Sequence, residues 1–289
     1  MVEYSVVIPV YNEEKSIKKI VSEVKAVMRS IKKSYEIIVV NDGSSDGTKK
    51  ILSSLKGIKV LTNENNRGYG YSLKRGIRAA SANWIIIIDA DQTYSPKDIK
   101  KLLDNIEGHD MVIGARVSKK RDIPLLRRPA KWLIGKISNY ITNTKIPDLN
   151  SGLRVFRKDM VYQFWGLFPD GFSFTTTLTI AALCNNYNVK YVPIDYFKRE
   201  GKSSINPIRD FIGFNKLLSK IALYFRPLKV FFPLSVLVFM LGVLRGIRDF
   251  LLNNSLGELS VILILSSLQI FFFGLLAELI VNRNRIKGP

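Results

Sequence analysis

The sequence predicts an α/β domain with a mostly parallel sheet, followed by an amphipathic segment and two membrane-spanning helices. Three observations support this expectation. Short apolar runs alternate with segments of helical periodicity over residues 1–115. Polar clusters follow three of the apolar runs. Two apolar stretches, each about as long as a bilayer is thick, lie near the end of the 289-residue chain.

The first half of the chain alternates predicted strands and helices. Strands are expected over residues 4–10, 35–40, 58–61, 84–88, 111–114 and 189–193. Helices are expected over 13–31, 69–80, 97–106 and the second half of 116–145, with a short one starting near 45–48. Further strand and helix are expected within 153–200. This alternation favours parallel strands joined by right-handed crossovers, with a ligand at the carboxyl ends of the strands.

The C-terminal region predicts attachment to a membrane. Residues 1–204 form the expected globular domain and 205–227 an amphipathic segment suited to the bilayer interface. Residues 228–281 hold two expected spans, 228–247 and 259–281, joined by an external loop over 248–258. The alternative is a pair of buried helices in a soluble protein. The basic tail 282–289 and Arg226 predict that the C-terminus and the globular domain both face the cytoplasm.

The composition limits the partners. Lys and Arg total 44 against 24 acids, a net charge of +20, which favours anionic partners. We find no nucleic-acid-binding motif, so lipid headgroups and phosphorylated substrates are preferred. The single cysteine, Cys184, excludes an internal disulfide, and the single histidine, His109, cannot build a metal cluster. The run 4–10 lacks a basic start and therefore predicts a first strand and not a signal peptide.

Two carboxylates, Asp89 and Asp91, follow the apolar run 84–88. Residues at i and i+2 face the same way if the strand continues, and like charges at that spacing repel unless a cation lies near them. Oxygen ligands suit Mg²⁺ or Mn²⁺, which commonly bridge to a diphosphate. The alternative reading is a polar turn that ends a strand.

The first two predicted strands also end in polar clusters, at residues 9–14 and 41–48. Because the carboxyl ends of parallel strands meet at one edge, the three clusters are expected to share a crevice. Tyr11 is placed to stack on a base and Asp42 to accept hydrogen bonds from a base or ribose. Glu13 and Glu14 have a second reading, since acids also favour a helix N-terminus.

Taken together, these motifs resemble glycosyltransferase family 2, with its GT-A fold. They are VIPVYNEE at 7–14, NDGSSDGT at 41–48, NRG at 66–68 and DAD at 89–91. NSGLRVF at 150–156, GFSF at 171–174 and KREGKSS at 198–204 resemble the subgroup that makes polyprenyl- and dolichyl-phosphate sugars. The resemblance covers residues 4–230.

The resemblance implies roles for individual residues. The nucleotide-binding positions would be Pro9, Tyr11, Glu13, Val40, Asp42, Asp89, Ala90 and Asp91. Asp89 and Asp91 would hold Mg²⁺ or Mn²⁺, and with Asp148 they are the expected catalytic residues. Gln92 is the expected third ligand, although the family's Gln usually stands one place later. The expected acceptor-phosphate cations are Arg116, Lys131, Arg199 and Lys202.

The expected reaction is inverting transfer of one hexose from a GDP-mannose or UDP-glucose type donor to a polyprenyl or dolichyl phosphate. A phosphate acceptor is already an anionic nucleophile and needs little general-base help. Two alternatives stay open. One is transfer to the hydroxyl of a glycolipid or lipid-linked oligosaccharide, with Asp148 as the candidate base. The other is a non-catalytic protein that binds a nucleotide-sugar. The spans can also pair with other copies of the chain.

Overall fold

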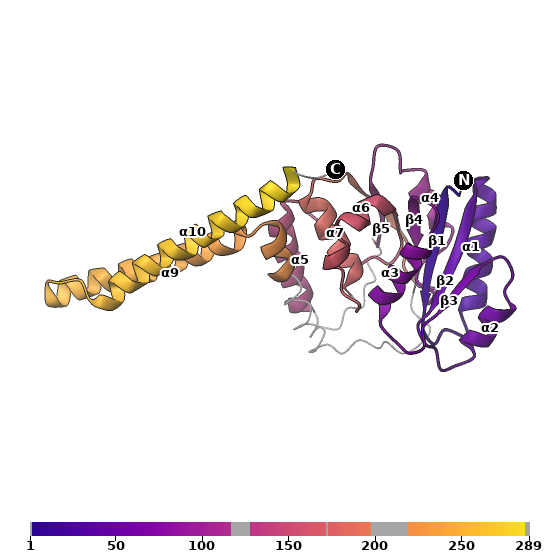
Figure 1. The fold of residues 1–289 in the computed structure, drawn as a ribbon, viewed down its shortest axis with the longest axis horizontal. Helices are drawn as coiled ribbons and strands as arrows, with labels where there is room; N and C mark the ends of the chain where they lie inside the picture. Colours follow the sequence, from indigo (N-terminus) through magenta and orange to yellow (C-terminus); the bar gives the residue numbers. More distant parts are fainter. Residues whose placement is uncertain (1, 117–127, 172, 198–218, 287–289) are drawn as a thin grey trace. The chain divides into compact units, whose positions relative to one another are not determined.

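The computed structural model describes residues 2–116, 128–171, 173–197 and 219–286 (Figure 1). The chain divides into two compact units, Met1–Ile212 and Gly213–Pro289. The first contains the sheet and the helices around it. The second consists mainly of a long helical hairpin.

A sheet of seven strands organises the described part of the first unit. The order across the sheet is β3-β2-β1-β4-β6-β5-β7. The strands are β1 (Tyr4–Val10), β2 (Tyr35–Asn41), β3 (Lys59–Thr62), β4 (Trp84–Ile87), β5 (Met111–Arg116), β6 (Arg154–Arg157) and β7 (Val189–Ile194). Only β6 runs antiparallel to its neighbours, β4 and β5. The mostly parallel sheet expected from the sequence is therefore confirmed.

Helices cover both faces of this sheet. The described helices are α1 (Ile17–Ile31), α2 (Thr48–Ser54), α3 (Tyr69–Ala79), α4 (Asp98–Leu103), α5 (Arg128–Thr142), α6 (Lys158–Gln163), the short η2 (Trp165–Leu167) and α7 (Phe174–Cys184). The buried stripe of α1, which includes Ile20 and Val24, packs with α4 against one face. Helix α3 packs on the other face of β1 and β2. Because β1 is covered on both faces, all seven of its residues are buried.

Helix α3 approaches the sheet closely at Gly76. A Cβ added to Gly76 would overlap Cγ1 of Val7 in β1 and lie 3.2 Å from Cγ2 of Val40 in β2. The missing side chain thus sets the distance between α3 and the sheet. Since α3 begins at Tyr69, beside the carboxyl ends of these strands, this packing also fixes the helix end that faces the site.

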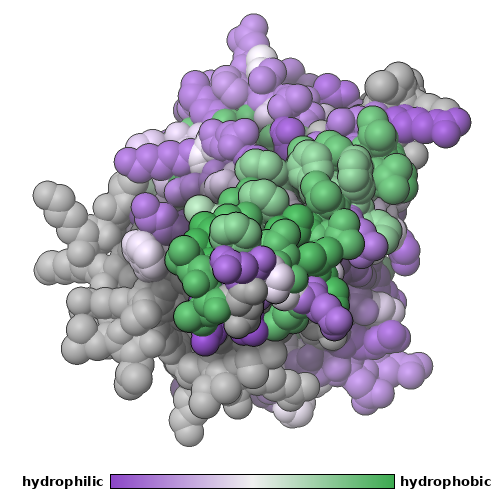
Figure 2. Space-filling view, turned by 90° about the vertical axis from the view of Figure 1, so that its left-hand side faces the viewer, coloured by the Kyte–Doolittle hydropathy of each residue, from purple (hydrophilic) through white to green (hydrophobic). Residues whose placement is uncertain are grey.

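The second unit is a hairpin of α9 (Leu228–Asn253) and α10 (Glu258–Ile286). Both helices are long and apolar enough to cross a membrane, over Leu228–Leu252 and Glu258–Arg283. They pack at glycines: a Cβ on Gly242 would come within 2.9 Å of Ile264, and one on Gly274 within 2.7 Å of Phe231. Figure 2 shows how apolar side chains gather on the hairpin's surface.

The hairpin differs from the sequence expectation at its turn. Helix α9 continues to Asn253, so only residues 254–257 separate the helices, where the sequence suggested a loop over 248–258. The extra turns are held by Asp249, which is 8% exposed and accepts a 2.8 Å hydrogen bond from the Ser260 hydroxyl of α10. Most of the amphipathic segment expected over 205–227 lies outside the described residues. The described part begins at residue 219, and residues 219–225 are helical.

Replacing Gly76 by Ala is expected to destabilise the first unit. The added methyl has no room against Val7, and such overpacking costs about 1–3 kcal/mol. Gly135→Ala in α5 is the matched control, because its Cβ would meet no described atom within 4 Å. That change should stabilise the helix by about 0.5–1 kcal/mol. Thermal unfolding of the detergent-solubilised variants would compare them, and equal shifts would contradict the close packing of α3.

Candidate functional site

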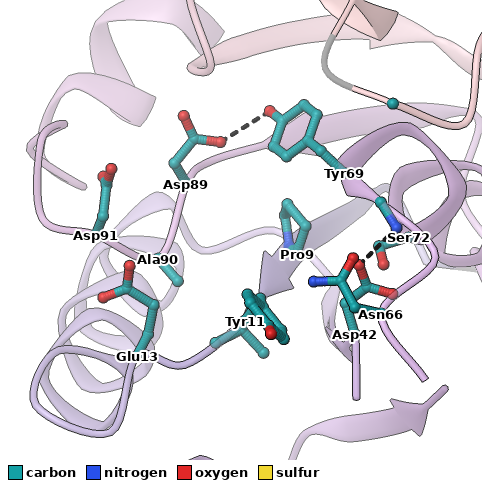
Figure 3. A pocket seen from close by; sticks show the side chains of 13 residues that line it. Pro9, Tyr11, Glu13, Asp42, Asn66, Tyr69, Ser72, Asp89, Ala90 and Asp91 are labelled. Carbon is teal, nitrogen blue, oxygen red and sulfur yellow. Dashed lines mark hydrogen bonds between the residues drawn. The ribbon is translucent and has the colours of Figure 1, made fainter. Parts of the chain in front are cut away.

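The described residues form a pocket at the carboxyl ends of β1, β2 and β4 (Figure 3). Its volume is about 320 Å³. It is lined by Pro9, Val10, Tyr11, Glu13, Asp42, Asn66, Gly68, Tyr69, Ser72, Asp89, Ala90, Asp91 and Gly171. The three polar clusters that follow the predicted strands thus meet in one cavity.

The carboxylate of Asp42 holds the loop that precedes α3. Its Oδ1 accepts hydrogen bonds from Nδ2 of Asn63 at 2.6 Å and from the backbone N–H of Arg67 at 3.0 Å. Its Oδ2 accepts one from the N–H of Gly68 at 2.8 Å. Asp42 is only 4% exposed. One buried acid therefore fixes the wall of the pocket that carries Asn66 and Gly68.

The opposite wall carries Asp89 and Asp91. Strand β4 ends at Ile87, so the alternation of a continuing strand does not orient the two carboxylates, contrary to the sequence argument. Instead, Asp89 Oδ1 accepts a 2.8 Å hydrogen bond from the hydroxyl of Tyr69. Asp91 Oδ1 accepts hydrogen bonds from the N–H and the hydroxyl of Thr93, at 3.1 and 2.6 Å. Burial and the charge of Asp91 raise the pKa of Asp89 to about 6.

A short segment before β6 packs closely against the carboxyl of Asp89 at Gly152. A Cβ on Gly152 would overlap the Asp89 carboxyl, so only glycine allows this approach. The N–H of Gly152 donates to the hydroxyl of buried Tyr94 at 2.7 Å. Arg154 is fully buried and donates from Nε and Nη2 to the carbonyl of Ser151, at 3.1 and 2.6 Å. Its Nη1 reaches Thr175 and Thr179 of α7, which ties this segment to the helix.

Arg116 and Asp148 form a bidentate ion pair. Nε and Nη2 of Arg116 donate to Oδ2 and Oδ1 of Asp148 at 2.6 and 2.7 Å. The backbone N–H groups of Arg116 and Asn150 also donate to this carboxylate. The guanidinium lies over the ring of Tyr196, 5.1 Å from its centroid. Burial alone would lower the pKa of Arg116, but its hydrogen bonds to Asp148 and its electrostatic interactions with Asp148, Tyr94 and Tyr196 together raise that pKa. The sequence named both residues but not their pairing.

The other predicted site residues lie in different places. Val40 is fully buried in β2 and does not line the pocket. Gln92 follows the pair with a φ of 59° and is also absent from the pocket lining. Lys131 belongs to α5, but its side chain is outside what the structure describes. Arg199 and Lys202 lie outside the described residues.

The structure adds Asn66, Tyr69 and Ser72 to the pocket, to which sequence reasoning gave no role. Asn66 lay within a noted motif. Tyr69 and Ser72 belong to the first turn of α3, where their spacing indicates only a helical face. Tyr94 likewise received no role, yet it supports Gly152. Their contributions depend on how α3 and the segment before β6 dock, which no local pattern reveals.

Comparison with known families identifies the class of protein. Residues 5–165, more than half of the chain, match the family described as Glycosyl transferase family 2. Residues 226–282 match a second family, described as the GtrB C-terminal hairpin, and include α9 and most of α10. The chain belongs to glycosyltransferase family 2, and its C-terminal part is a hairpin of the GtrB type.

Named relatives narrow the class further. The chain is 28% identical over 302 residues to dodecaprenyl-phosphate galacturonate synthase of Rhizobium johnstonii, covering 97% of this chain and 88% of the relative. It is 27% identical over 223 residues to dolichyl-phosphate hexose transferase of Haloferax volcanii, covering 76% and 94%. The resemblance to enzymes that make polyprenyl-phosphate sugars is therefore confirmed.

Solved structures confirm the fold. Glucosyl-3-phosphoglycerate synthase from Mycobacterium tuberculosis, in complex with Mn²⁺, UDP and phosphoglyceric acid, matches with a TM-score of 0.60. The two chains are 18% identical, and the match covers 76% of this chain and 78% of the other. The expected GT-A architecture is thereby confirmed.

Breaking the pair of Arg116 and Asp148 is expected to destabilise the first unit. Asp148→Ala leaves a largely buried guanidinium without its acid, and loss of one partner of a buried pair costs about 3–5 kcal/mol. Arg116→Ala should cost a similar amount. Chemical unfolding of both single variants and of the double variant would give the coupling energy. Effects that simply add would show that the pair does not act as a unit.

Proposed function

We propose that this chain transfers a single hexose from a nucleotide-sugar to a polyprenyl phosphate at the cytoplasmic face of a membrane. The observation that carries the proposal is the pocket itself. It joins an aromatic and polar wall, made by Tyr11, Asp42 and Asn66, to the carboxylate pair Asp89 and Asp91. The first wall suits a nucleoside and the second suits the metal-bound diphosphate of a donor. The names of the two polyprenyl- and dolichyl-phosphate relatives support the acceptor.

The residues of the pocket fit a divalent cation. Asp89 and Asp91 offer oxygen ligands of the kind that Mg²⁺ and Mn²⁺ prefer. The described residues contain no group of three or more His, Cys, Asp or Glu side chains placed to hold a metal. The donor diphosphate would therefore supply several of the ligands, as is usual for Mg²⁺ at phosphate sites. When bound, the ion supplies charge stabilisation to the departing nucleoside diphosphate. The Mn²⁺ complex of the solved neighbour supports this assignment.

The pair of Arg116 and Asp148 favours an acceptor that is already ionised. Asp148 accepts hydrogen bonds from Arg116 and Asn150 and is only 5% exposed. A carboxylate held in this way is poorly placed to take a proton from a sugar hydroxyl, because both of its oxygens already accept hydrogen bonds. A phosphate oxygen needs no such base. Arg116 is proposed as a source of positive charge for such an anionic acceptor.

In the proposed reaction a phosphate oxygen of the acceptor attacks the anomeric carbon from the side opposite the diphosphate. A new C–O bond forms as the bond to the nucleoside diphosphate breaks, so the configuration inverts. Asp42, Asn66 and Tyr11 hold the donor's nucleoside, and Asp89 and Asp91 hold its diphosphate end. Lys131, Arg199 and Lys202 are proposed as further acceptor-phosphate cations, on the family resemblance alone.

The hairpin supplies the membrane attachment in this proposal. Two spans return the chain to its starting side, so the first unit and the C-terminus share the cytoplasmic face. Arg283 and the neighbouring basic residues of the tail support this orientation. A prenyl chain in the same bilayer would then present its phosphate at the membrane surface.

A transfer assay tests the proposed reaction. Purified protein, Mn²⁺ and a polyprenyl phosphate are offered labelled UDP- and GDP-sugars. Label should enter the organic phase and be released by mild acid. Asp91→Ala should lower the rate by roughly 10²-fold or more, the scale of losing one electrostatic contact to developing charge. Asp104→Ala is the matched control, since Asp104 is exposed at the end of α4 and should not matter.

Three outcomes would contradict the proposal. A labelled lipid that resists mild acid would indicate a hydroxyl acceptor. Binding of a nucleotide-sugar without transfer to any lipid would indicate a non-catalytic binding protein. Equal rates for Asp91→Ala and Asp104→Ala would remove the carboxylate pair from the mechanism.

Cysteine labelling tests the membrane topology. The sole native cysteine, Cys184, is buried, so it gives little background. Ser255→Cys, in the exposed hairpin turn, should react with a membrane-impermeant maleimide added outside intact cells. Ser53→Cys, exposed at the end of α2, should react only after the cells are permeabilised. The reverse pattern would overturn the proposed orientation.

A further inference from the structure

Two glycines flank Tyr69 and allow the start of α3 to pack against residues 169–171. This packing places Tyr69 in the pocket. Gly68 has a φ of 102°, and a Cβ on it would lie 2.6 Å from the carbonyl oxygen of Asp170. A Cβ on Gly70 would overlap the carbonyl oxygen of Pro169. The N–H of Gly70 donates to Gly171 at 3.1 Å, and the N–H of Tyr71 donates to Asp170 at 2.9 Å. The backbone on both sides of Tyr69 is therefore fixed.

The docked backbone aims the Tyr69 ring across the pocket at Asp89 (Figure 3). The hydroxyl reaches Oδ1 of Asp89 at 2.8 Å. A phenol is protonated at neutral pH, so the Tyr69 hydroxyl is the donor in this bond. Hydrogen bonds to a charged acceptor in a buried site are among the stronger ones.

Two groups therefore contact the carboxyl of Asp89, one at each oxygen. Tyr69 bonds to Oδ1, while the backbone of Gly152 packs against Oδ2. Asp91 is oriented differently, by Thr93 of its own turn. Among the described residues, Tyr69 thus links the carboxylate pair to α3, whose preceding loop is held by Asp42 on the nucleoside side of the pocket.

We infer that Tyr69 is a positioning residue for the donor. It fixes the Asp89 carboxylate in the orientation that receives the metal-bound diphosphate of a nucleotide-sugar, and it couples that orientation to the loop on the nucleoside side. The inference rests on the proposed function for the identity of the ligand. If the ring only filled space, removing the Tyr69 hydroxyl would not change the affinity for the donor nucleotide.

Tyr69→Phe separates these two roles, because it keeps the ring and removes only the hydroxyl. The full-length protein is titrated calorimetrically with UDP and with GDP, in Mn²⁺ and again in EDTA. In Mn²⁺ the variant should bind the nucleotide that the wild type prefers about 10- to 100-fold more weakly, as expected for a lost hydrogen bond to a buried charge. In EDTA the affinity should change less than threefold. Tyr71→Phe, on the same helix with its ring beside Arg67, is the matched control and should match the wild type in both.

A second set of variants tests whether Tyr69 acts through Asp89. In the background of Asp89→Ala, Tyr69→Phe should cause no further loss of Mn²⁺-dependent affinity. A further loss equal to that in the wild-type background would overturn the inference, as would equal affinities of Tyr69→Phe and Tyr71→Phe in Mn²⁺. Equal weakening with Mn²⁺ and EDTA, together with a lower unfolding temperature, would also overturn it. A wild type that binds neither nucleotide would instead refute the proposed function, and the inference with it.

Discussion

The described structure of the first unit depends on holding two negative charges close together at the end of a buried strand. Asp89 and Asp91 follow β4, the fourth strand of the seven-stranded sheet. Burial and the charge of Asp91 both disfavour ionisation of Asp89. Neighbouring groups partly offset this effect, because the Tyr69 hydroxyl and the charges of Arg116 and Arg154 favour the ionised form of Asp89. Carboxyl groups whose pKa is shifted by burial and a neighbouring charge are typical of functional sites.

The groups that contact Asp89 are brought close to it at glycine positions, where a side chain would block the approach. Gly152 passes directly beneath the carboxyl, and Gly68 and Gly70 let α3 dock close enough for Tyr69 to span the pocket. Arg154 is a buried cation whose hydrogen bonds, among the described residues, go to carbonyl and hydroxyl oxygens. Its burial lowers its pKa, which is a cost that a purely structural residue could avoid. The positive charge it keeps beside Asp89 and Asp148 gives a reason for its presence.

The sequence predicted those parts of the site that follow directly from strand ends. Pro9 lies near the end of an apolar run, and Tyr11, Asp42 and the pair at 89 and 91 follow such runs; parallel strands must bring these residues to one edge. It did not predict contacts made between separate loops. Arg116 and Asp148 stand 32 residues apart, and their pairing depends on β6 entering the sheet beside β5. Tyr69 reads as an ordinary helical residue until the docking of α3 is known.

The pairing of Arg116 with Asp148 also bears on which kind of acceptor the site can use. An enzyme that activates a hydroxyl needs a base whose lone pair is available near the reacting oxygen. Asp148, the candidate base, has both oxygens engaged by a guanidinium and lies almost fully buried. The same contacts hold Arg116 over the ring of Tyr196. These contacts fix the position of the Arg116 cation and occupy both oxygens of the candidate base. Under the proposed function, a cation fixed in advance would suit an acceptor that brings its own negative charge beside a donor already carrying two phosphates, and a lipid phosphate is such an acceptor.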